Sequence, residues 1–278
     1  MVERYQSPEH VSGGRLAIAA LSDKGPACSV NEDSLAVHVT DHNQPCGGTL
    51  LVVADGLGGH NAGEVASRMV AEHVPAFFFR NTAENRLEAM QEAIQATNSM
   101  MHDAARTSST LVGMGSTVVT GLITRQYLIT ANVGDSRAYV FRQGAKLLKT
   151  ADDSTAYELP GIVQRRRGLS HALTQALGVQ RHISPHIQIL RIEPEDIILM
   201  CTDGITDVLS DNDISEIVRG QDITNCAREL VAAATTNGST DNMSVIIGRV
   251  LQIAPLERMH ISMSALDSYV VPSIDPMV

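Results

Sequence analysis

Carboxylate side chains recur in this sequence where runs of apolar residues begin or end. The run at 50–54 stops at Asp55-Gly56, and a later run stops at Asp203-Gly204. The other acidic positions of this kind are the pair Glu32-Asp33, Asp135 in NVGDSR and Asp241 in STDNMS. One Asp-Gly pair is usually only a turn, but five acidic positions at strand ends suggest a common task.

Carboxylates that converge from separate strands require a cation between them. Two such groups about 4 Å apart repel by about 4 kcal/mol at an effective dielectric constant of about 20. Sites made only of oxygen ligands favour magnesium, manganese or calcium over zinc. Shared carboxylates suit two metals about 3.5–4 Å apart with a bridging water. If these residues meet in the fold, they predict a two-metal site that activates water and steadies phosphoryl oxygens.

The composition favours one soluble domain and disfavours several classes of function. The chain has 278 residues, a formal net charge of −10, a pI of about 5.4 and no tryptophan. A nucleic-acid groove needs basic residues and stacking rings, so we expect no nucleic-acid partner. Four scattered cysteines without a C-x-x-C pair suit a reducing compartment. With no apolar signal region and no membrane span of roughly 20 residues, we expect a cytoplasmic protein without a membrane partner.

Alternating and continuous apolar runs predict many short strands. The predicted strands are 15–23, 33–39, 49–54, 115–124, 127–134, 137–142, 146–150, 186–192, 196–204 and 241–251. Their connections are hairpin-short and the helices come in pairs, so we predict an α+β domain in which helix pairs cover antiparallel sheets. This domain occupies 15–251, after an N-terminal arm at 1–14 and before a C-terminal tail at 252–278 that is either disordered or a docking segment.

Helical spacing predicts two pairs of helices. In the first helix, Asn61 and Glu64 resemble a capping box, and Pro75 is expected to bend or end it. This helix is expected to bury Ala66, Val70, Val74 and Phe77. The next carries Leu87, Met90, Ile94 and Met101 at helical spacing, most simply as core residues. Two further helices are expected at about 212–219 and 222–236.

Seven segments, in this order, carry a resemblance to a known family. They are NEDS, VVADGLGGHNAGEVAS, GSTVV, ANVGDSRAYV, LTQALG, LMCTDGITDVLSDNDI and STDNMSVIIGRV. Together they resemble the motifs of the metal-dependent protein phosphatases of type 2C, in the bacterial form, over most of the chain. The resemblance implies a four-layer α-β-β-α sandwich. It also implies hydrolysis of phosphoserine and phosphothreonine in proteins by water with Mn²⁺ or Mg²⁺, without a covalent phosphoenzyme.

The resemblance also implies a role for each acidic position. Asp55 is expected to bridge two metals at the catalytic centre, and the backbone carbonyl of Gly56 is expected to bind one of them. That carbonyl role would explain why position 56 lacks a side chain. Asp203 and Asp241 are expected to complete the shell of the other metal, and Asp33 to bind a metal or orient its water.

Four further positions receive roles from the same motifs. Asp135 matches a ligand of a third, more weakly bound metal in the bacterial members. His60 matches a catalytic histidine that protonates the leaving alkoxide. Around the metals, Glu32 is expected to hold water, and Asn242 beside Asp241 is expected to support the ligands.

Two positions depart from the family pattern. The arginine that grips the substrate phosphate is replaced by Cys28, and a thiol cannot make its bidentate charged contact. We expect weaker phosphate binding, or replacement of the arginine by Lys24 or another nearby base. Asp153 replaces the histidine of a D-H-S motif, and the segment after it is short. The run 165–167 in that segment is a solvated basic turn or, as a sharper alternative, a docking site for phosphoproteins.

Alternative functions remain open at this point. One is a catalytically weak or inactive, metal-bound interaction module on the same fold, which Cys28 makes plausible. Another is a metal-dependent phosphodiesterase or nuclease that uses the same carboxylates. No C-x5-R loop or P-loop is found, which disfavours cysteine-dependent phosphatases and P-loop enzymes. The favoured interpretation is an active phosphatase, expected to be monomeric, that acts on a phosphorylated protein and opposes a Ser/Thr kinase.

Overall fold

The computed structural model describes residues 14–40, 47–58, 62–83, 85–154, 172–219 and 222–253, and the structural statements below concern these residues. Their strands form two sheets in which every pair of neighbouring strands is antiparallel. The arm and tail predicted at the ends of the chain lie almost entirely outside this part. Within it, no helix has the length and apolar character needed to cross a membrane.

The first sheet has five strands in the order β1-β11-β10-β7-β8. Their bounds are β1 Gly14–Asp23, β7 Arg137–Arg142, β8 Ala145–Lys149, β10 Ile197–Cys201 and β11 Met243–Ile253. The sheet therefore joins the two ends of the described chain, because β1 pairs with β11 over its whole length.

The second sheet has six strands, with β2-β3-β5-β6-β9 in order and β4 paired to the end of β3. Their bounds are β2 Asp33–Val39, β3 Thr49–Leu57, β4 Gly115–Ser116, β5 Val118–Thr124, β6 Tyr127–Val133 and β9 His186–Arg191. Each predicted strand is therefore present, with ends that differ by a few residues. The largest changes are at 196–204, where the strand ends at Cys201 and a helix begins at Asp203.

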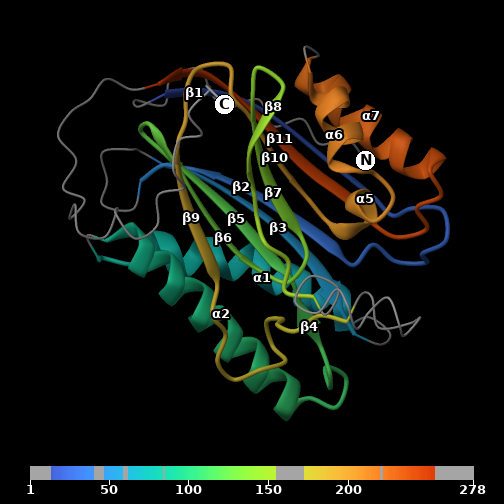
Figure 1. Ribbon diagram of the computed structural model, residues 1–278. Coiled ribbons are helices and arrows are strands. Elements are labelled where there is room, and N and C mark those ends of the chain that lie inside the picture. Colours follow the sequence, from blue (N-terminus) through green and yellow to red (C-terminus); the bar gives the residue numbers. More distant parts are fainter. Residues whose placement is uncertain are drawn as a thin grey trace.

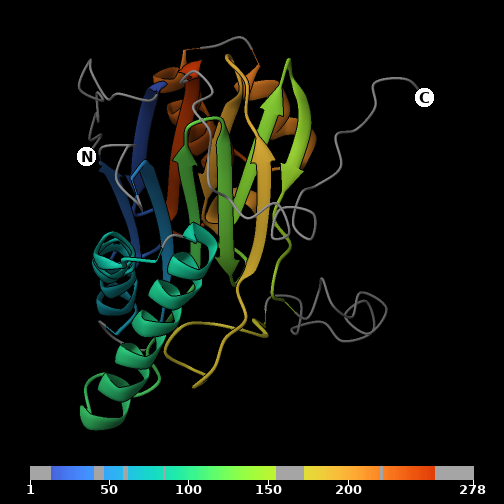
Figure 2. The same ribbon diagram turned by 90° about the vertical axis from the view of Figure 1, so that its left-hand side faces the viewer.

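Helices cover the outer faces of both sheets. Helices α1 (Ala62–Arg80) and α2 (Arg86–Thr107) lie on the second sheet, and α5 (Asp203–Thr206), α6 (Asp211–Val218) and α7 (Ile223–Thr236) lie on the first. Figure 1 shows α1 and α2 on one side of the strands and α6 and α7 on the other. Turned by 90°, the strands of both sheets run in the same general direction between the helices (Figure 2). This arrangement is the predicted four-layer sandwich.

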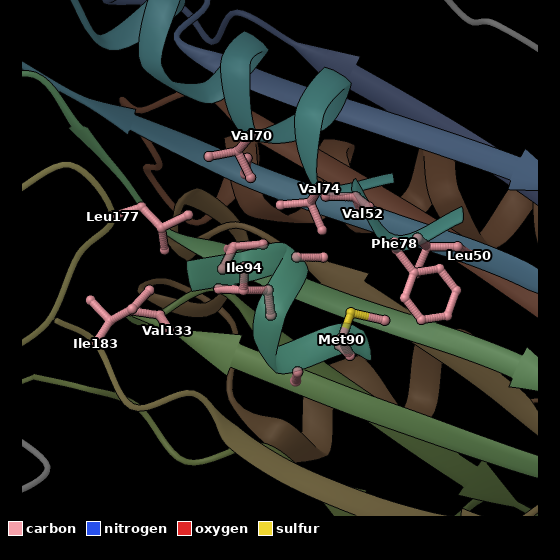
Figure 3. Close-up of a cluster of buried hydrophobic side chains, with 14 of the residues drawn as sticks. Leu50, Val52, Val70, Val74, Phe78, Met90, Ile94, Val133, Leu177 and Ile183 are labelled. Carbon is pink, nitrogen blue, oxygen red and sulfur yellow. The ribbon is translucent and has the colours of Figure 1, made fainter. Parts of the chain in front are cut away.

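Three apolar layers hold the sandwich together. The layer under α1 and α2 contains Val70, Val74 and Phe78 of α1, which face Leu50 and Val52 of β3 (Figure 3). A second layer lies between the two sheets, and a third lies under α5, α6 and α7. Buried apolar surface contributes roughly 25 cal/mol per Å², so these three layers give the site a rigid frame.

Helix α1 limits one prediction and corrects another. Of the two effects expected of Pro75, a bend or an end, the structure excludes the end, because the helix continues for five residues beyond the buried proline. The helix continues because the turn after Pro75 packs well: Phe78 is fully buried in the layer against β3. This burial offsets the loss of the backbone hydrogen bond that a proline removes. Phe77, predicted as core, is only partly buried. Ala66, Val70 and Val74 are buried as predicted, whereas the predicted cap Asn61 lies outside the described residues.

Candidate metal centre

Strand pairing in the second sheet brings two of the predicted ligands together. In the antiparallel register of β2 and β3, Asp33 is the Cα partner of Asp55. The N–H of Asp55 donates to Thr117 Oγ1 at 3.0 Å, and its carbonyl accepts from the N–H of Thr117 at 2.8 Å. Both backbone polar groups of Asp55 are therefore hydrogen-bonded to Thr117, which fixes the position of the residue, as a metal ligand requires.

The first sheet supplies the next carboxylate through Thr202, which follows β10. Thr202 Oγ1 donates to Asp33 Oδ2 at 3.0 Å, a contact that joins the two sheets. The same hydroxyl accepts the N–H of Ser244 in β11 at 3.1 Å. Asp203 begins α5 directly after this threonine, so it lies on the same edge of the sandwich as Asp33.

Four aspartates, Asp33, Asp55, Asp135 and Asp203, have a raised pKa, and nearby carboxylates that include Asp241 contribute to it. Burial, followed by the charges of Asp33, Asp203, Asp135 and Asp241, raises the pKa of Asp55 well above its usual range. Burial raises the pKa of Asp33 to about 7, against two hydrogen bonds that lower it. Burial and nearby carboxylates raise the pKa of Asp135 to about 7 and that of Asp203 to about 6. We refer to these five residues as the carboxylate cluster.

Asp207 is a further acidic neighbour that the motif analysis did not include. It caps the C-terminus of α5, one helical turn after Asp203. After burial, Asp207 is the largest cause of the raised pKa of Asp203, and it also raises the pKa of Asp135. The spacing of four residues in DGITD was the available signal, since residues four apart lie on one face of a helix.

The carboxylate cluster offers a donor set that fits hard divalent cations. Oδ1 of Asp33 and Oδ1 of Asp203 are buried without a hydrogen-bond partner, and a buried carboxylate oxygen needs a donor or a cation. All the side-chain donors are oxygen atoms, which suits Mn²⁺ or Mg²⁺. Among the described residues, no three acidic, histidine or cysteine side chains already surround one point.

Asn242 fastens the loop at 24–32 to the start of β11. Its Oδ1 accepts the N–H of Glu32 at 2.7 Å, and its Nδ2 donates to the carbonyls of Lys24 at 2.7 Å and Val30 at 3.2 Å. These bonds fix the chain on either side of Glu32 next to Asp241, whose Oδ1 accepts the N–H of Asn242 at 2.7 Å. The predicted supporting role of Asn242 is consistent with this geometry.

Gly56 is required for packing. A Cβ at this position would lie 2.0 Å from the carbonyl oxygen of Gly63 and 2.7 Å from that of Glu32. The N–H of Gly56 donates to the same Glu32 carbonyl at 3.0 Å. Position 56 therefore needs glycine because α1 and the loop that carries Glu32 both pack against its backbone. This reason is independent of any binding of a metal by the Gly56 carbonyl. A Cβ at Gly63 would in turn meet the Glu32 carboxylate at 2.7–2.8 Å.

Cys28 lies beside the carboxylate cluster. Its Sγ is 3.5 Å from the carbonyl of Thr240 and 3.8 Å from Oδ1 of Asp241. Burial, then the neighbouring Asp241 charge, raises the pKa of the Cys28 thiol, so the side chain is neutral. The ammonium of Lys24, also predicted to meet the phosphate, donates to the carbonyl of Cys28. Position 28 therefore carries no charge, and the ammonium of Lys24 is bound to the backbone carbonyl of the same residue.

Several predicted features lie outside the described residues. They are His60, the proposed proton donor, and the basic run 165–167. The aspartate that departs from the D-H-S pattern is described, however. Asp153 is buried and accepts hydrogen bonds from the backbone N–H of Gly134 at 3.0 Å and from His186 Nε2 at 2.7 Å. Sequence analysis gave no role to His186.

The fold and the site define a divalent-cation-binding α+β sandwich, in which acidic residues from both sheets lie at one edge. The chain belongs to the protein phosphatase 2C family, whose model matches residues 27–244. It is similar to the serine/threonine phosphatase stp of Listeria welshimeri, with 29% identity over 237 residues that cover 81% of this chain and 92% of that protein. It is also similar to the serine/threonine protein phosphatase PstP of Mycobacterium tuberculosis, with 30% identity over 241 residues that cover 85% of this chain and 45% of that protein.

Solved structures show the same fold. A serine/threonine phosphatase of S. agalactiae superposes with a TM-score of 0.74 and 27% identity, covering 85% of this chain and all of that one (100%). The catalytic domain of PstP in complex with two manganese ions has a TM-score of 0.72 and 30% identity, covering 85% of this chain and 98% of that one.

Proposed function

We infer that this chain is a metal-dependent protein phosphatase that hydrolyses phosphoserine and phosphothreonine in proteins with Mn²⁺ or Mg²⁺. The observation that carries this conclusion is the carboxylate cluster, in which Asp33 and Asp203 each keep one buried oxygen without a hydrogen-bond partner. Membership of the protein phosphatase 2C family and the two manganese ions of the PstP structure agree with it. Retention of every carboxylate argues against an inactive interaction module.

We propose that the carboxylate cluster divides its ligands between two cations. Asp55 bridges them, and the Gly56 carbonyl binds one. Asp203 and Asp241 serve the other cation, while Asp33 binds a cation or orients its water. The mutual pKa effects of these aspartates support the assignment. We assign Asp135, which is linked electrostatically to Asp203, to a third and weaker cation.

The bound cations supply Lewis acidity, which activates water and stabilises charge on phosphoryl oxygens. The chain's own part is to hold the acids rigidly. Thr117 fixes the backbone of Asp55, and Asn242 fixes the loop that carries Glu32. We propose that Glu32 holds water beside the cations and that His60 gives a proton to the leaving alkoxide. No side chain needs to accept the phosphoryl group.

For the substrate phosphate we propose Lys24 as the binding cation, next to the neutral Cys28. Lys24 is exposed and its ammonium already lies against the 28 position. One flexible ammonium makes a weaker and less directional contact than a guanidinium fork. We further propose that the substrate is a phosphoprotein made by an opposing Ser/Thr kinase, in the cytoplasm.

The experiment that tests this function compares phosphomonoesterase activity with and without Mn²⁺. The wild-type chain is expected to hydrolyse a phosphothreonine peptide only with Mn²⁺, and Asp55→Asn is expected to reduce the rate by more than about 100-fold, because even the partners of metal ligands are worth roughly 10- to 100-fold. Asp103→Asn, an exposed aspartate of α2, is the matched control and should retain activity. An active Asp55→Asn protein, or faster turnover of a phosphodiester, would contradict the proposal.

A further inference from the structure

Asp153 is a buried carboxylate whose two oxygens are both occupied. Oδ2 accepts the backbone N–H of Gly134 at 3.0 Å. Oδ1 accepts Gln175 Nε2 at 3.1 Å and pairs with His186 Nε2 at 2.7 Å. The Asp153 side chain is 3% exposed and that of His186 is 45% exposed. Burying a carboxylate is unfavourable unless hydrogen-bond donors surround it. The three donors around Asp153 therefore stabilise this carboxylate in its buried position.

The partners of Asp153 all lie on segments that meet at one edge of the second sheet. His186 begins β9 and is the Cα partner of Asn132 in β6. Gly134 follows β6 directly, where the chain turns toward β7 with φ of 99°. The imidazole therefore anchors the Asp153 carboxylate to an edge strand, and the carboxylate anchors the turn after the neighbouring strand.

The backbone of Asp153 strengthens this hold. Its N–H donates to the carbonyl of Gly134 at 2.9 Å, so the backbone N–H and the backbone carbonyl of Gly134 are both bound by one residue. Its carbonyl accepts the N–H of Thr174 at 2.8 Å. The residue after Gly134 is Asp135, a member of the carboxylate cluster. Asp153 therefore holds the backbone turn that orients Asp135. His186, through its bond to the carboxylate, helps to hold Asp153 in this position.

We propose that Asp153 and His186 form a positioning pair that aims Asp135 at the weakly bound third cation. The pair touches neither substrate nor the two central cations, and the proposal rests on the proposed function only in treating Asp135 as a ligand. Supporting partners of metal ligands usually contribute about 10- to 100-fold in affinity. Loss of the pair should therefore weaken the third site selectively.

The test uses His186→Ala, with His186→Gln as the variant that keeps an amide N–H donor for Asp153. His182→Ala, an exposed histidine four positions earlier, is the matched control. Two readouts apply: the ¹⁵N–¹H shift of the Gly134 amide without metal, and Mn²⁺ binding followed by electron paramagnetic resonance and calorimetry. We expect His186→Ala to move the Gly134 resonance and to weaken only the weakest Mn²⁺ site, by about tenfold. His186→Gln should restore most of both, and His182→Ala should change neither.

The outcomes separate this inference from the proposed function. An unchanged Gly134 resonance in His186→Ala overturns the pair itself, whatever the activity. A moved resonance with weak-site affinity unchanged within twofold overturns the link to Asp135. Wild-type protein that binds only two Mn²⁺ ions yet hydrolyses the peptide overturns the positioning role and leaves the phosphatase intact. If His186→Ala unfolds, His186→Gln decides: it supports the pair only if the Gly134 resonance and weak-site affinity match those of wild type.

Discussion

At the scale of single residues, we expect Cys28 to change how this phosphatase binds a phosphate group. The thiol is neutral and lies 3.8 Å from Asp241 Oδ1, while Glu32 is a further negative neighbour. An arginine at this position would have acidic partners to orient it, and its fork would match phosphate oxygens. Because the thiol carries no charge, we propose that substrate binding depends on Lys24 and on the cations.

We expect Cys28→Arg to strengthen phosphopeptide binding. A charge-assisted bidentate contact is worth roughly 1.5–3 kcal/mol, so the KM for a phosphothreonine peptide should fall by about 10- to 150-fold, with a smaller change in kcat. The measurement is steady-state kinetics at saturating Mn²⁺. Cys28→Ser, which keeps the size and neutrality of the side chain, should leave KM unchanged. Equal KM values for the arginine and serine variants would show that phosphate binding is not limited at position 28.

At the scale of helices and strands, the sequence predicted what local patterns control. The alternating and continuous apolar runs located the strands, and helical spacing identified Met90 and Ile94 as core, because burial of one face dictates both patterns. It could not decide whether Pro75 ends the helix; the helix continues because packing of Phe78 against the sheet outweighs the proline's local cost. It also extended the strand before Asp203 too far, because a four-residue helix such as α5 has too few turns to show a period.

The polar residues between the sheets allow a test at this scale. Thr130 of β6 is on the same face of the strand as Leu128, which lies in the layer between the sheets. Its buried hydroxyl has no hydrogen-bond partner. We expect Thr130→Val to leave the free energy of unfolding unchanged or to raise it by up to about 1 kcal/mol, because a buried, unpaired hydroxyl is unfavourable. Chemical denaturation measures this change.

Thr150→Val is the matched control, because Thr150 is equally buried but its Oγ1 accepts the N–H of Ala138 at 3.0 Å. Its replacement leaves that N–H unpaired, and the free energy of unfolding should fall by about 1–3 kcal/mol. If the free energy of unfolding falls by the same amount in both valine variants, the Thr130 hydroxyl stabilises the fold, and the expectation based on its lack of a hydrogen-bond partner is wrong.

At the scale of the whole molecule, the two sheets assemble a site from segments that are far apart in the chain. Asn242 holds Glu32 across 210 positions, and Thr202 holds Asp33 across 169. The motif resemblance identified those acids as candidates, because the NEDS segment contains both of them. It could not show that Thr202 joins the sheets or that His186 supports Asp153, since such contacts depend on strand register and not on spacing.

Burial, and then repulsion between neighbouring carboxylates, disfavours the charged form of Asp33, Asp135 and Asp203, and bound cations or protons relieve both effects. The pKa values of Asp33 and Asp135 are raised to about 7 and that of Asp203 to about 6, whereas aspartates in the unfolded chain titrate near about 3.9. Between these values the folded protein binds more protons than the unfolded one. Stability then falls as pH rises, because its slope follows the protons bound by the unfolded state minus those bound by the folded state.

We therefore expect the EDTA-treated protein to be more stable at about pH 5 than at about pH 8, with most of the loss between about pH 4 and pH 7. Mn²⁺ competes with protons for the same oxygens, so it should raise Tm more at the higher pH and flatten the profile. Thermal unfolding with EDTA and with Mn²⁺ measures both effects. Asp33→Asn, which cannot ionise, should show a shallower slope in EDTA, whereas the exposed Asp103→Asn should match wild type. Stability that rises with pH in EDTA would mean that neither burial nor repulsion disfavours the charged aspartates in the fold, and the two-cation centre would lose its physical basis.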